Sequence, residues 1–566
     1  MVGNTFTASA ATVAFAGVSL LALVAPFELT QPLVRLPRQS ISHLEAALLV
    51  AFAAWGAALV WFRAMPAWQT PLTAPWIVLL VILTAAALAS PVSRLNALHL
   101  TGRLTAAFGV YLLTVNGVRT RARLCLVLDL VLAAGVIVSV LVFLEYLGVK
   151  PVLDMLKAFR PGITVVGSQL RAGGPLQYPT ISSMYLEVVF AFGLGLLLAA
   201  LDAGRLARLL VLFVALIVIA EAITMTFTRA GLITMATSLT VVALARRLQR
   251  GSDAGTALLA GLAVVIAALL FTSRSAESVW LRLTSEGQES WYRARVAGPD
   301  PVELATGRTA SIPVTVTNTG RLVWDSHAET PFYFSYHWLP VTGDRFVVFE
   351  GARTAFPAPV VPGASASLLA RVRAPSEPGR YRLEWDVVQE GRLWFSTEPG
   401  AARMLSAATV TGGTFDDPLN RPMAPPRPTE RPGRLVLWRA AARMLAAHPL
   451  LGVGPDNFRL SYGDYTALKA ADPRLHSNNM YIEMFAGGGL LGGGAFLWLI
   501  WRAGAVAVRA VRIEPGVAAA MLAIAVHGLV DSFLSFAPTY LLFSLTLGLA
   551  VASPRVGKIG PDAHRI

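Results

Sequence analysis

The sequence is poor in cysteine and in charged residues. Cys125 is its only cysteine, so neither an intramolecular disulfide nor a cysteine-based metal site can form. Asp, Glu, Lys and Arg make up 14% of the 566 residues, against about a quarter in typical soluble domains. Hydrophobic residues make up 55%, and the mean hydropathy is +0.59. These values exclude an ordinary soluble protein.

Several motifs are also missing. The sequence has no HExxH motif, no Asp-rich loop and no P-loop, so it indicates neither a metal nor a nucleotide nor any other cofactor. The net charge of +14 comes largely from arginines scattered between apolar runs. Such scattering favours contact with membrane lipids and an anionic glycolipid substrate over binding of nucleic acid.

Apolar runs of about 18 or more residues recur along the chain, and each is long enough to cross roughly 30 Å of hydrocarbon. They predict a polytopic α-helical membrane protein with roughly twelve transmembrane helices. The first run lacks a basic flank and a small-residue cleavage site, so we expect a retained span rather than a signal peptide. The predicted spans are residues 8–27, 42–62, 75–91, 104–117, 123–146, 181–201, 207–226, 230–246, 254–272, 479–501, 516–535 and 537–553.

Basic clusters in alternate connections predict the orientation, because positively charged loops stay in the cytoplasm. Both termini are then cytoplasmic, and the long segment from about Ser273 to Arg474 lies outside, in the periplasm or extracellular space. The clusters are Arg119, Arg121 and Arg123; Arg205 and Arg208; Arg246, Arg247 and Arg250; Arg502, Arg509 and Arg512; and Arg555 with Lys558. The outer connections also carry arginines, which raises the question of what these bind: Arg35, Arg38, Arg94, Arg103, Arg171 and Arg229.

The outer segment changes to a β pattern, with apolar residues such as Ile312, Val314 and Val316 at every second position. Leu383, Trp385 and Val387 alternate in the same way with Arg382, Glu384 and Asp386. About seven short strands separated by Gly/Pro turns predict an inserted, extracytoplasmic all-β sandwich of the immunoglobulin-like kind. Aromatic residues such as Trp324, Trp338 and Trp394 either stack on sugars from an exposed face or, as we favour for any one of them, fill the core.

These patterns predict the domain order. It is an N-terminal transmembrane region 1–272 of about nine helices, a connector 273–300, the β-domain 301–412, a Pro-rich linker 413–433, an amphipathic helix with a loop 434–478, and a C-terminal transmembrane region 479–566 of about three helices. The amphipathic helix has two possible places, on the membrane surface or beneath the β-domain. Its apolar face is Leu435, Leu437, Trp438, Ala441, Met444 and Leu445.

The phrase HPLLGVGPDNF (His448 to Phe458) is followed by HSNN, directly before a long apolar run that carries Glu483. Ser477 or Asn478 is the expected cap of that helix. The segment resembles the carboxy-terminal signature of the O-antigen ligase and O-antigen polymerase family. There, a phrase hPllGvGpgnF precedes a His-Asn pair and a helix ending in Glu-x-Gly-x-x-Gly. Counting back from Gly489 and Gly492 puts Asn478-Asn479 at the His-Asn pair, with His476 two residues earlier.

The resemblance extends to RAGGPLQYPTISSMYL, FTRAGLI and HGLVD, and so to most of the membrane region but not to the β-domain. It implies a donor glycan on undecaprenyl pyrophosphate. Arg171 and Arg229 would neutralise the departing pyrophosphate. Either His476 supplies the family's histidine from a shifted position or Asn478 replaces it. The expected site residues are His476, Asn478, His527 and Asp531 for catalysis, and Arg171, Arg229, Arg459 and Glu483 for substrate binding.

His476 is the first choice for the base, and His527, oriented by Asp531 on one helical face, is the reserve. For Glu187 and Glu221 we favour structural ion pairs. The sequence thus predicts a ligase-type glycosyltransferase in a bacterial cytoplasmic membrane, acting on a glycolipid, glycan or protein acceptor. The alternatives are a polymerase that joins lipid-linked repeat units, or a non-catalytic glycan-binding membrane protein or transporter.

Overall fold

The computed structural model describes residues 2–36, 39–160, 164–166, 169–272, 291–328, 331–390, 393–398, 404–413, 432–466 and 471–556. The chain divides into two compact units. The first comprises Met1–Thr164, Leu170–Leu283 and Pro432–Ile566, and the second comprises Val165–Gln169 and Thr284–Arg431. The predicted connector and Pro-rich linker lie mostly outside the described residues.

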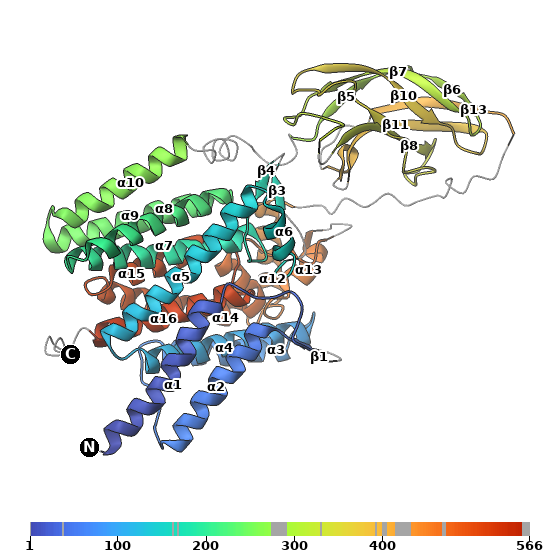
Figure 1. The fold of residues 1–566 in the computed structure, drawn as a ribbon. Coiled ribbons are helices and arrows are strands. Elements are labelled where there is room, and N and C mark those ends of the chain that lie inside the picture. Colours follow the sequence, from blue (N-terminus) through green and yellow to red (C-terminus); the bar gives the residue numbers. More distant parts are fainter. Residues whose placement is uncertain are drawn as a thin grey trace. The chain divides into compact units, whose positions relative to one another are not determined.

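The first unit is a bundle of helices (Figure 1). In the described part of the chain, nine helices are long and apolar enough to cross a membrane, and three apolar helices are shorter. Together they match the twelve predicted spans one for one, so the chain is a multi-pass membrane protein, while the number of crossings stays a prediction. They are α1 (Val2–Val24), α2 (His43–Trp61), α3 (Thr73–Leu88), α4 (Arg94–Gly117), α5 (Arg121–Tyr146), α7 (Pro179–Asp202), α8 (Leu206–Met225), α9 (Arg229–Arg250), α10 (Ala254–Thr272), α14 (Met480–Ala510), α15 (Pro515–His527) and α16 (Ala537–Val556).

Smaller elements accompany the bundle. Two short antiparallel pairs occur, β1 (Val34–Leu36) with β2 (Gln39–Ile41), and β3 (Thr164–Val166) with β4 (Gln169–Arg171). Among the residues that the structure describes, three helices lie outside the predicted spans: α6 (Lys150–Leu156), α12 (Arg434–Ala447) and α13 (Phe458–Thr466).

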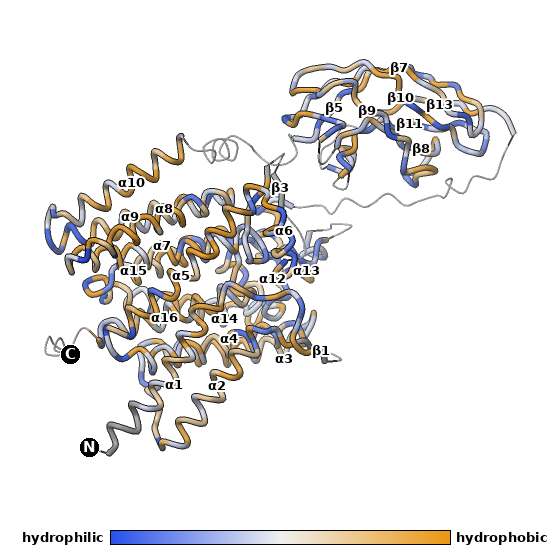
Figure 2. The backbone as a smooth tube through the Cα atoms, viewed as in Figure 1, coloured by the Kyte–Doolittle hydropathy of each residue, from blue (hydrophilic) through white to orange (hydrophobic). Residues whose placement is uncertain are grey.

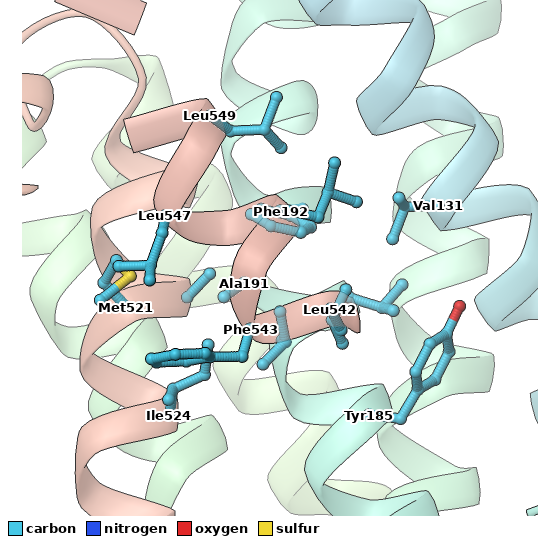
Figure 3. Packing of buried hydrophobic residues seen from close by; sticks show 14 of the residues in the cluster. Val131, Tyr185, Ala191, Phe192, Met521, Ile524, Leu542, Phe543, Leu547 and Leu549 are labelled. Carbon is cyan, nitrogen blue, oxygen red and sulfur yellow. The ribbon is translucent and has the colours of Figure 1, made fainter. Parts of the chain in front are cut away.

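The core of the bundle forms around α7 and α16, whose residues are nearly all buried. Hydrophobic residues predominate in the helices of the bundle (Figure 2). Phe192 of α7 and Phe543 of α16 lie in this core beside Ile524 of α15 (Figure 3). Helix α15 approaches α7 closely, because a Cβ added at Gly516 would lie 2.6 Å from the Ala191 carbonyl oxygen. Small residues thus permit contact between backbones, as is common between membrane helices.

The bundle has two ends that differ in their contacts. At one end, Arg246 forms ion pairs with Asp202 and Asp253, and Arg121 lies 3.7 Å from Glu514. These residues belong to connections that the positive-inside rule predicts to be cytoplasmic. The residues of the candidate site lie at the other end. The connections predicted to be cytoplasmic therefore lie together at one end of the bundle, and the candidate site lies at the other. Which end faces the cytoplasm stays a prediction.

The second unit is rich in β-structure and contains two sheets. One has the order β10-β7-β5, and the other has the order β6-β13-β11-β8-β9 with β12 beside β11; β6 and β13 are parallel. The hydroxyl of Tyr336 accepts from the Arg373 amide and thereby joins strand β8 to β10. The strands are β5 (Ala294–Ala297), β6 (Val302–Ala305), β7 (Thr309–Asn318), β8 (Phe332–Pro340), β9 (Thr354–Ala355), β10 (Ser365–Arg373), β11 (Gly379–Gln389), β12 (Leu393–Trp394) and β13 (Met404–Thr411), with a short 3-10 helix η2 (Phe395–Thr397). The immunoglobulin-like assignment stays a prediction.

Strand β11 departs from the predicted alternation, because all residues from Leu383 to Gln389 are buried. The second face is covered by an aromatic cluster that includes Phe349 and Trp394. Asp386 is buried there with partners: His337 Nε2 lies 3.1 Å from its Oδ2, and the Ser396 amide donates to it. A buried carboxylate is tolerated because these groups satisfy its oxygens.

The three tryptophans that were candidates for sugar stacking, Trp324, Trp338 and Trp394, belong to the interior of the β-rich unit. Trp324 and Trp338 have no exposed surface and Trp394 is 8% exposed. The Trp338 indole donates to the Arg373 carbonyl, and Trp394 packs against His337. The favoured alternative therefore holds, and these rings form no exposed platform for sugars.

Helix α12 packs against elements of the first unit. Its buried residues are Leu437, Ala440, Ala441 and Met444, in a cluster with Phe458, Tyr462 and Ala486. Neither prediction placed this face against α13 and α14, which cover its buried part, and the position of the helix at the membrane surface or beneath the β-domain stays a prediction. Leu435, which was assigned to the apolar face, is 66% exposed.

This packing predicts different effects for two leucines of α12. Leu437→Ala is expected to lower the free energy of unfolding by about 2–3 kcal/mol, because it leaves a cavity in a closed cluster. Leu435→Ala is the matched control and should change it by less than about 0.5 kcal/mol. Thermal unfolding of the purified protein in detergent measures both. Equal losses would contradict the observed packing.

Candidate functional site

The HPLLGVGPDNF phrase is held by a break in α14. Gly489 interrupts this helix with φ 65° and ψ −165°. In an uninterrupted helix the amides of Leu490 and Leu491 would pair with the carbonyls of Ala486 and Gly487, four residues earlier. All four groups instead bind the phrase. Leu490 and Leu491 donate to the Pro449 and Leu450 carbonyls, while Val453 and Gly454 donate to Ala486 and Gly487.

Glycine is required at the centre of this interlock. A Cβ at Gly489 would lie 2.3 Å from the Leu450 carbonyl carbon and oxygen, and a Cβ at Gly452 would lie 2.4 Å from the Ala486 carbonyl oxygen. Both glycines also have positive φ values, which L side chains rarely adopt. The sequence predicted one uninterrupted span here. It was wrong on this point because the break depends on hydrogen bonds to a segment about forty residues earlier.

The end of the phrase is fixed to the third and fourth helices. Asn457 is fully buried, and its amide donates to the Ser90 hydroxyl at 2.8 Å and to the Ser93 carbonyl at 3.0 Å. Asn96 of α4 donates in turn to the Asn457 side chain and to Asp456. Residues far apart in the sequence thus place Asp456 rigidly. None of these amides was singled out from the sequence.

Three charged or ionisable groups meet beside Asp456. Arg459 binds its Oδ2 through Nε at 2.9 Å and through Nη2 at 2.8 Å. The His476 Nδ1 lies 3.3 Å from Glu483 Oε1 and 3.9 Å from Asp456 Oδ1. The other Glu483 oxygen accepts from the Ser477 amide at 2.9 Å. The structure therefore joins His476, Arg459 and Glu483, which the sequence predicted, to Asp456, which it missed.

These neighbours shift the pKa of His476. Burial disfavours the imidazolium and opposes the shift, but the hydrogen bond to Glu483 and the negative charges of Glu483 and Asp456 outweigh burial and the repulsion by Arg459. The pKa of His476 is therefore raised above its ordinary value. Because both carboxylates face Nδ1, the neutral ring carries its hydrogen there, and Nε2 is the basic nitrogen.

The HSNN segment caps α14 with Asn479, whose side chain accepts from the amides of Tyr481 and Ile482. The predicted cap, Ser477 or Asn478, is wrong by one or two residues. Asn478 precedes the cap with φ 53°, and within the described residues no hydrogen bond of its side chain is present. Asn479 also donates to the Leu529 carbonyl, and Met480 donates to that of Gly528.

The turn that follows α15, residues 528–536, connects this cluster to a second histidine. The predicted span continued to residue 535, but α15 ends at His527 because the next carbonyl, that of Gly528, accepts from α14. Ser535 of the turn donates to Asp456 Oδ1 at 3.0 Å, and the Phe536 ring lies 6.3 Å from that of His476.

His527 itself is 1% exposed and lies between two carboxylates. Its Nδ1 is 2.9 Å from Glu187 Oε2, and its Nε2 is 3.9 Å from Asp531 Oδ2. Asp531 follows the helix end in a turn, not on the expected helical face, but remains near because its amide donates to the His527 carbonyl. Glu187 contacts His527, and the purely structural role that we favoured for it stays a prediction. A histidine so enclosed is poorly placed to reach an acceptor.

Two of the three arginines predicted to bind substrate, Arg171 and Arg229, belong to segments that contact each other. Arg171 of β4 donates through Nε to the Thr226 carbonyl at 2.9 Å and lies 3.4 Å from the Thr228 hydroxyl. Thr228 directly precedes Arg229, an exposed residue that opens α9. Two residues further along α9, a Cβ at Gly231 would lie 3.1 Å from Glu187 Oε1. The arginine segments thus adjoin the His527 pair.

The segment directly after Arg171 is anchored by Glu145. Glu145 is fully buried, forms an ion pair with Arg160, and accepts from the amides of Gly173 at 3.0 Å and Gly174 at 2.7 Å. In the described ranges, no group of three or more His, Cys, Asp or Glu residues is arranged to hold a metal ion. The site thus offers arginines, carboxylates and an imidazole as its reactive groups.

Comparison with known proteins bears on these segments. Residues 391–499 match the family model described as O-antigen ligase. The match includes the interlocked phrase, the HSNN segment and the broken part of α14. No curated protein matches the chain. The resemblance noted for the carboxy-terminal signature is thereby confirmed, while the resemblance of the other three segments, which lie outside the match, stays a prediction.

Proposed function

We propose that this chain, whose residues 391–499 match the O-antigen ligase family model, is a ligase-type membrane glycosyltransferase. It transfers a glycan from undecaprenyl pyrophosphate to an acceptor hydroxyl on the outer side of a bacterial cytoplasmic membrane. Both termini are cytoplasmic in this proposal. The acceptor is a glycolipid, a glycan or a protein.

The geometry of His476 carries the proposal. Its Nδ1 faces Glu483 and Asp456, and its Nε2 makes no hydrogen bond within the described residues. The ring is 13% exposed at its side chain, so a substrate group can reach it. A histidine held by carboxylates at one nitrogen and open at the other suits a general base.

The reaction that follows is a displacement at the anomeric carbon. The acceptor hydroxyl gives its proton to His476 Nε2 while its oxygen forms the new bond to the anomeric carbon. The bond from that carbon to the pyrophosphate oxygen breaks, and its electron pair leaves with the pyrophosphate. Arg171 and Arg229 stabilise the negative charge that develops there, because guanidinium groups remain charged and bind phosphate oxygens in pairs.

The roles of the other expected residues are refined by their contacts. Arg459 donates to Asp456, to the Asn96 side chain and to the Pro473 carbonyl, so we assign it to support of Asp456 rather than to substrate. Glu483 orients His476, and Asn478 marks the entrance beside it. His527 and Asp531 hold the 528–536 turn in place.

A transfer assay in nanodiscs tests the function. Labelled undecaprenyl-pyrophosphate glycan is supplied with and without a separate acceptor, and release of undecaprenyl pyrophosphate is measured with and without a chelator. Transfer to the acceptor supports a ligase, and growth of the glycan without it identifies a polymerase. Loss of activity in the chelator would contradict the metal-independent mechanism. Glycan binding without release from folded protein would favour the receptor alternative.

Arg229→Ala is expected to lower kcat/KM for the donor by roughly a hundredfold, because one charge-assisted contact to pyrophosphate is lost. Arg229→Lys keeps the positive charge but loses the planar guanidinium, which can form two parallel hydrogen bonds to phosphate. It should therefore recover only part of the lost kcat/KM. Arg35→Ala, in another connection predicted to lie outside, is the control and should leave kcat/KM unchanged. Full activity of Arg229→Ala would remove this residue from the proposed pyrophosphate site.

A further inference from the structure

Asp456 has an unusual backbone for a residue with a side chain. Its φ is 62°, in the left-handed region, at a position where the family phrase has glycine. Such a conformation costs about 1 kcal/mol or more and persists where surrounding contacts enforce it. Here the enforcing contacts all involve its own groups: Asn96 binds its carbonyl, and Arg459 and Ser535 bind its carboxylate.

The two carboxylate oxygens of Asp456 have different surroundings. Oδ2 accepts from Arg459 and from Asn96 at 3.2 Å. Oδ1 accepts from Ser535 at 3.0 Å and faces His476 Nδ1 at 3.9 Å. The first oxygen is thus fixed by the protein, and the second lies on the side of the imidazole. The side chain is 11% exposed.

The charges around His476 balance only after it takes up a proton. The charged groups that face it are Glu483 of α14, Asp456 of the loop before α13, and Arg459 of α13. The 528–536 turn contributes the uncharged Phe536 ring. Two negative charges and one positive charge leave a net charge of −1 beside the neutral ring. An imidazolium formed during the reaction would bring the sum to zero.

We propose that Asp456 is a positioning residue of the reaction, a second carboxylate that acts through His476. It holds the Nδ1 hydrogen together with Glu483 and stabilises the imidazolium that forms when Nε2 accepts the proton of the acceptor hydroxyl. This inference rests on the proposed function for its catalytic meaning. The effect of Asp456 on the orientation and the pKa of the His476 imidazole does not depend on the proposed function.

The direction of the expected pH effect follows from the charges. His476 acts as a base only when neutral, so activity rises as the pH rises through its pKa. Asp456 favours the imidazolium, and its removal lowers the pKa of His476. The acid limb of the pH profile of kcat then moves to lower pH. At high pH, where the base is neutral in both proteins, the variant is slower because the imidazolium is less stabilised.

Asp456→Asn is the sharpest test, because Asn tolerates the left-handed conformation and keeps the size while it removes the charge. We expect kcat at high pH to fall about tenfold, as a partial loss of general-base catalysis, with KM for the donor unchanged. Asp456→Gly, which suits the backbone and also lacks the carboxylate, should behave alike. Asp464→Asn, at an exposed position of α13, is the control.

A second readout separates this inference from the proposed function. The rate at which diethyl pyrocarbonate modifies His476, followed by mass spectrometry against pH, reports the pKa of this histidine without any substrate. A lower pKa in both Asp456 variants supports the positioning role even if no donor is turned over. An unchanged pKa with unchanged kcat overturns it. Thermal unfolding of each variant shows whether a loss of activity comes only from a loss of folded protein.

Discussion

His476→Ala is expected to lower kcat for glycan transfer about a thousandfold, because it removes the general base. This corresponds to about 4 kcal/mol of transition-state stabilisation. The fold should persist, since the ring contributes a contact to Phe536 and pairs with Glu483 but lies at the edge of the described core. KM for the donor should change little, because the arginines bind the pyrophosphate. Single-turnover transfer in nanodiscs measures the effect.

Three variants make the result specific. His99→Ala removes an exposed histidine of α4 and should retain full activity. Asn478→Ala is expected to cost at most a few-fold, although Asn478 occupies the position of the family's histidine. His527→Ala is expected to be unstable, because it leaves Glu187 buried without its partner at 2.9 Å. Activity that survives in His476→Ala but disappears in a folded Asn478→Ala would place the chemistry at Asn478.

Gly489→Ala is expected to lower the free energy of unfolding by about 2–5 kcal/mol, the combined effect of a forced left-handed conformation and of overpacking. The added methyl would lie 2.3 Å from backbone atoms of Leu450, which cannot move without breaking the interlock with α14. Because this interlock places both Asp456 and the HSNN segment, transfer should be lost with it. Thermal unfolding in detergent and the transfer assay measure the two effects.

Gly494→Ala provides the matched comparison in the same helix. A Cβ at Gly494 meets nothing within 4 Å, and this glycine has no positive φ. Alanine there should be neutral or should stabilise by about 0.5–1 kcal/mol, because it restricts the unfolded chain. A similar loss of stability in both variants would mean that the helix, and not its junction with the phrase, is sensitive to substitution.

Much of the fold followed from periodicity. The apolar runs predicted each of the twelve helices, and the alternation of Ile312, Val314 and Val316 predicted β7, because these patterns reflect local preferences of the chain. The boundaries that failed depend on distant partners. The end of α15 at His527 follows from the hydrogen bond between the Met480 amide and the Gly528 carbonyl. Likewise, the burial of Asp386, which the predicted alternation did not include, depends on its contact with His337 on another strand.

The candidate site shows the same division. The sequence named His476, Glu483 and Arg459, because ionisable residues at the ends of apolar runs are conspicuous. It overlooked Asp456 in GPDNF. The signal that could have identified it is that Asp456 stands where the family phrase has glycine, and its φ is positive. It could not identify Asn96 and Ser535, since serine and asparagine at helix ends usually act only as caps.

By itself, the sequence determined that this is a multi-pass membrane protein with a β-rich insertion and a signature of the O-antigen ligase family. Hydrophobicity along the chain and a local motif are sufficient for that. Only the tertiary structure showed that the HPLLGVGPDNF phrase forms hydrogen bonds with the break in α14. It also showed that Asp456 and Glu483 both face Nδ1 of His476. These relations join residues of separate segments through hydrogen bonds and charge, which no local pattern encodes.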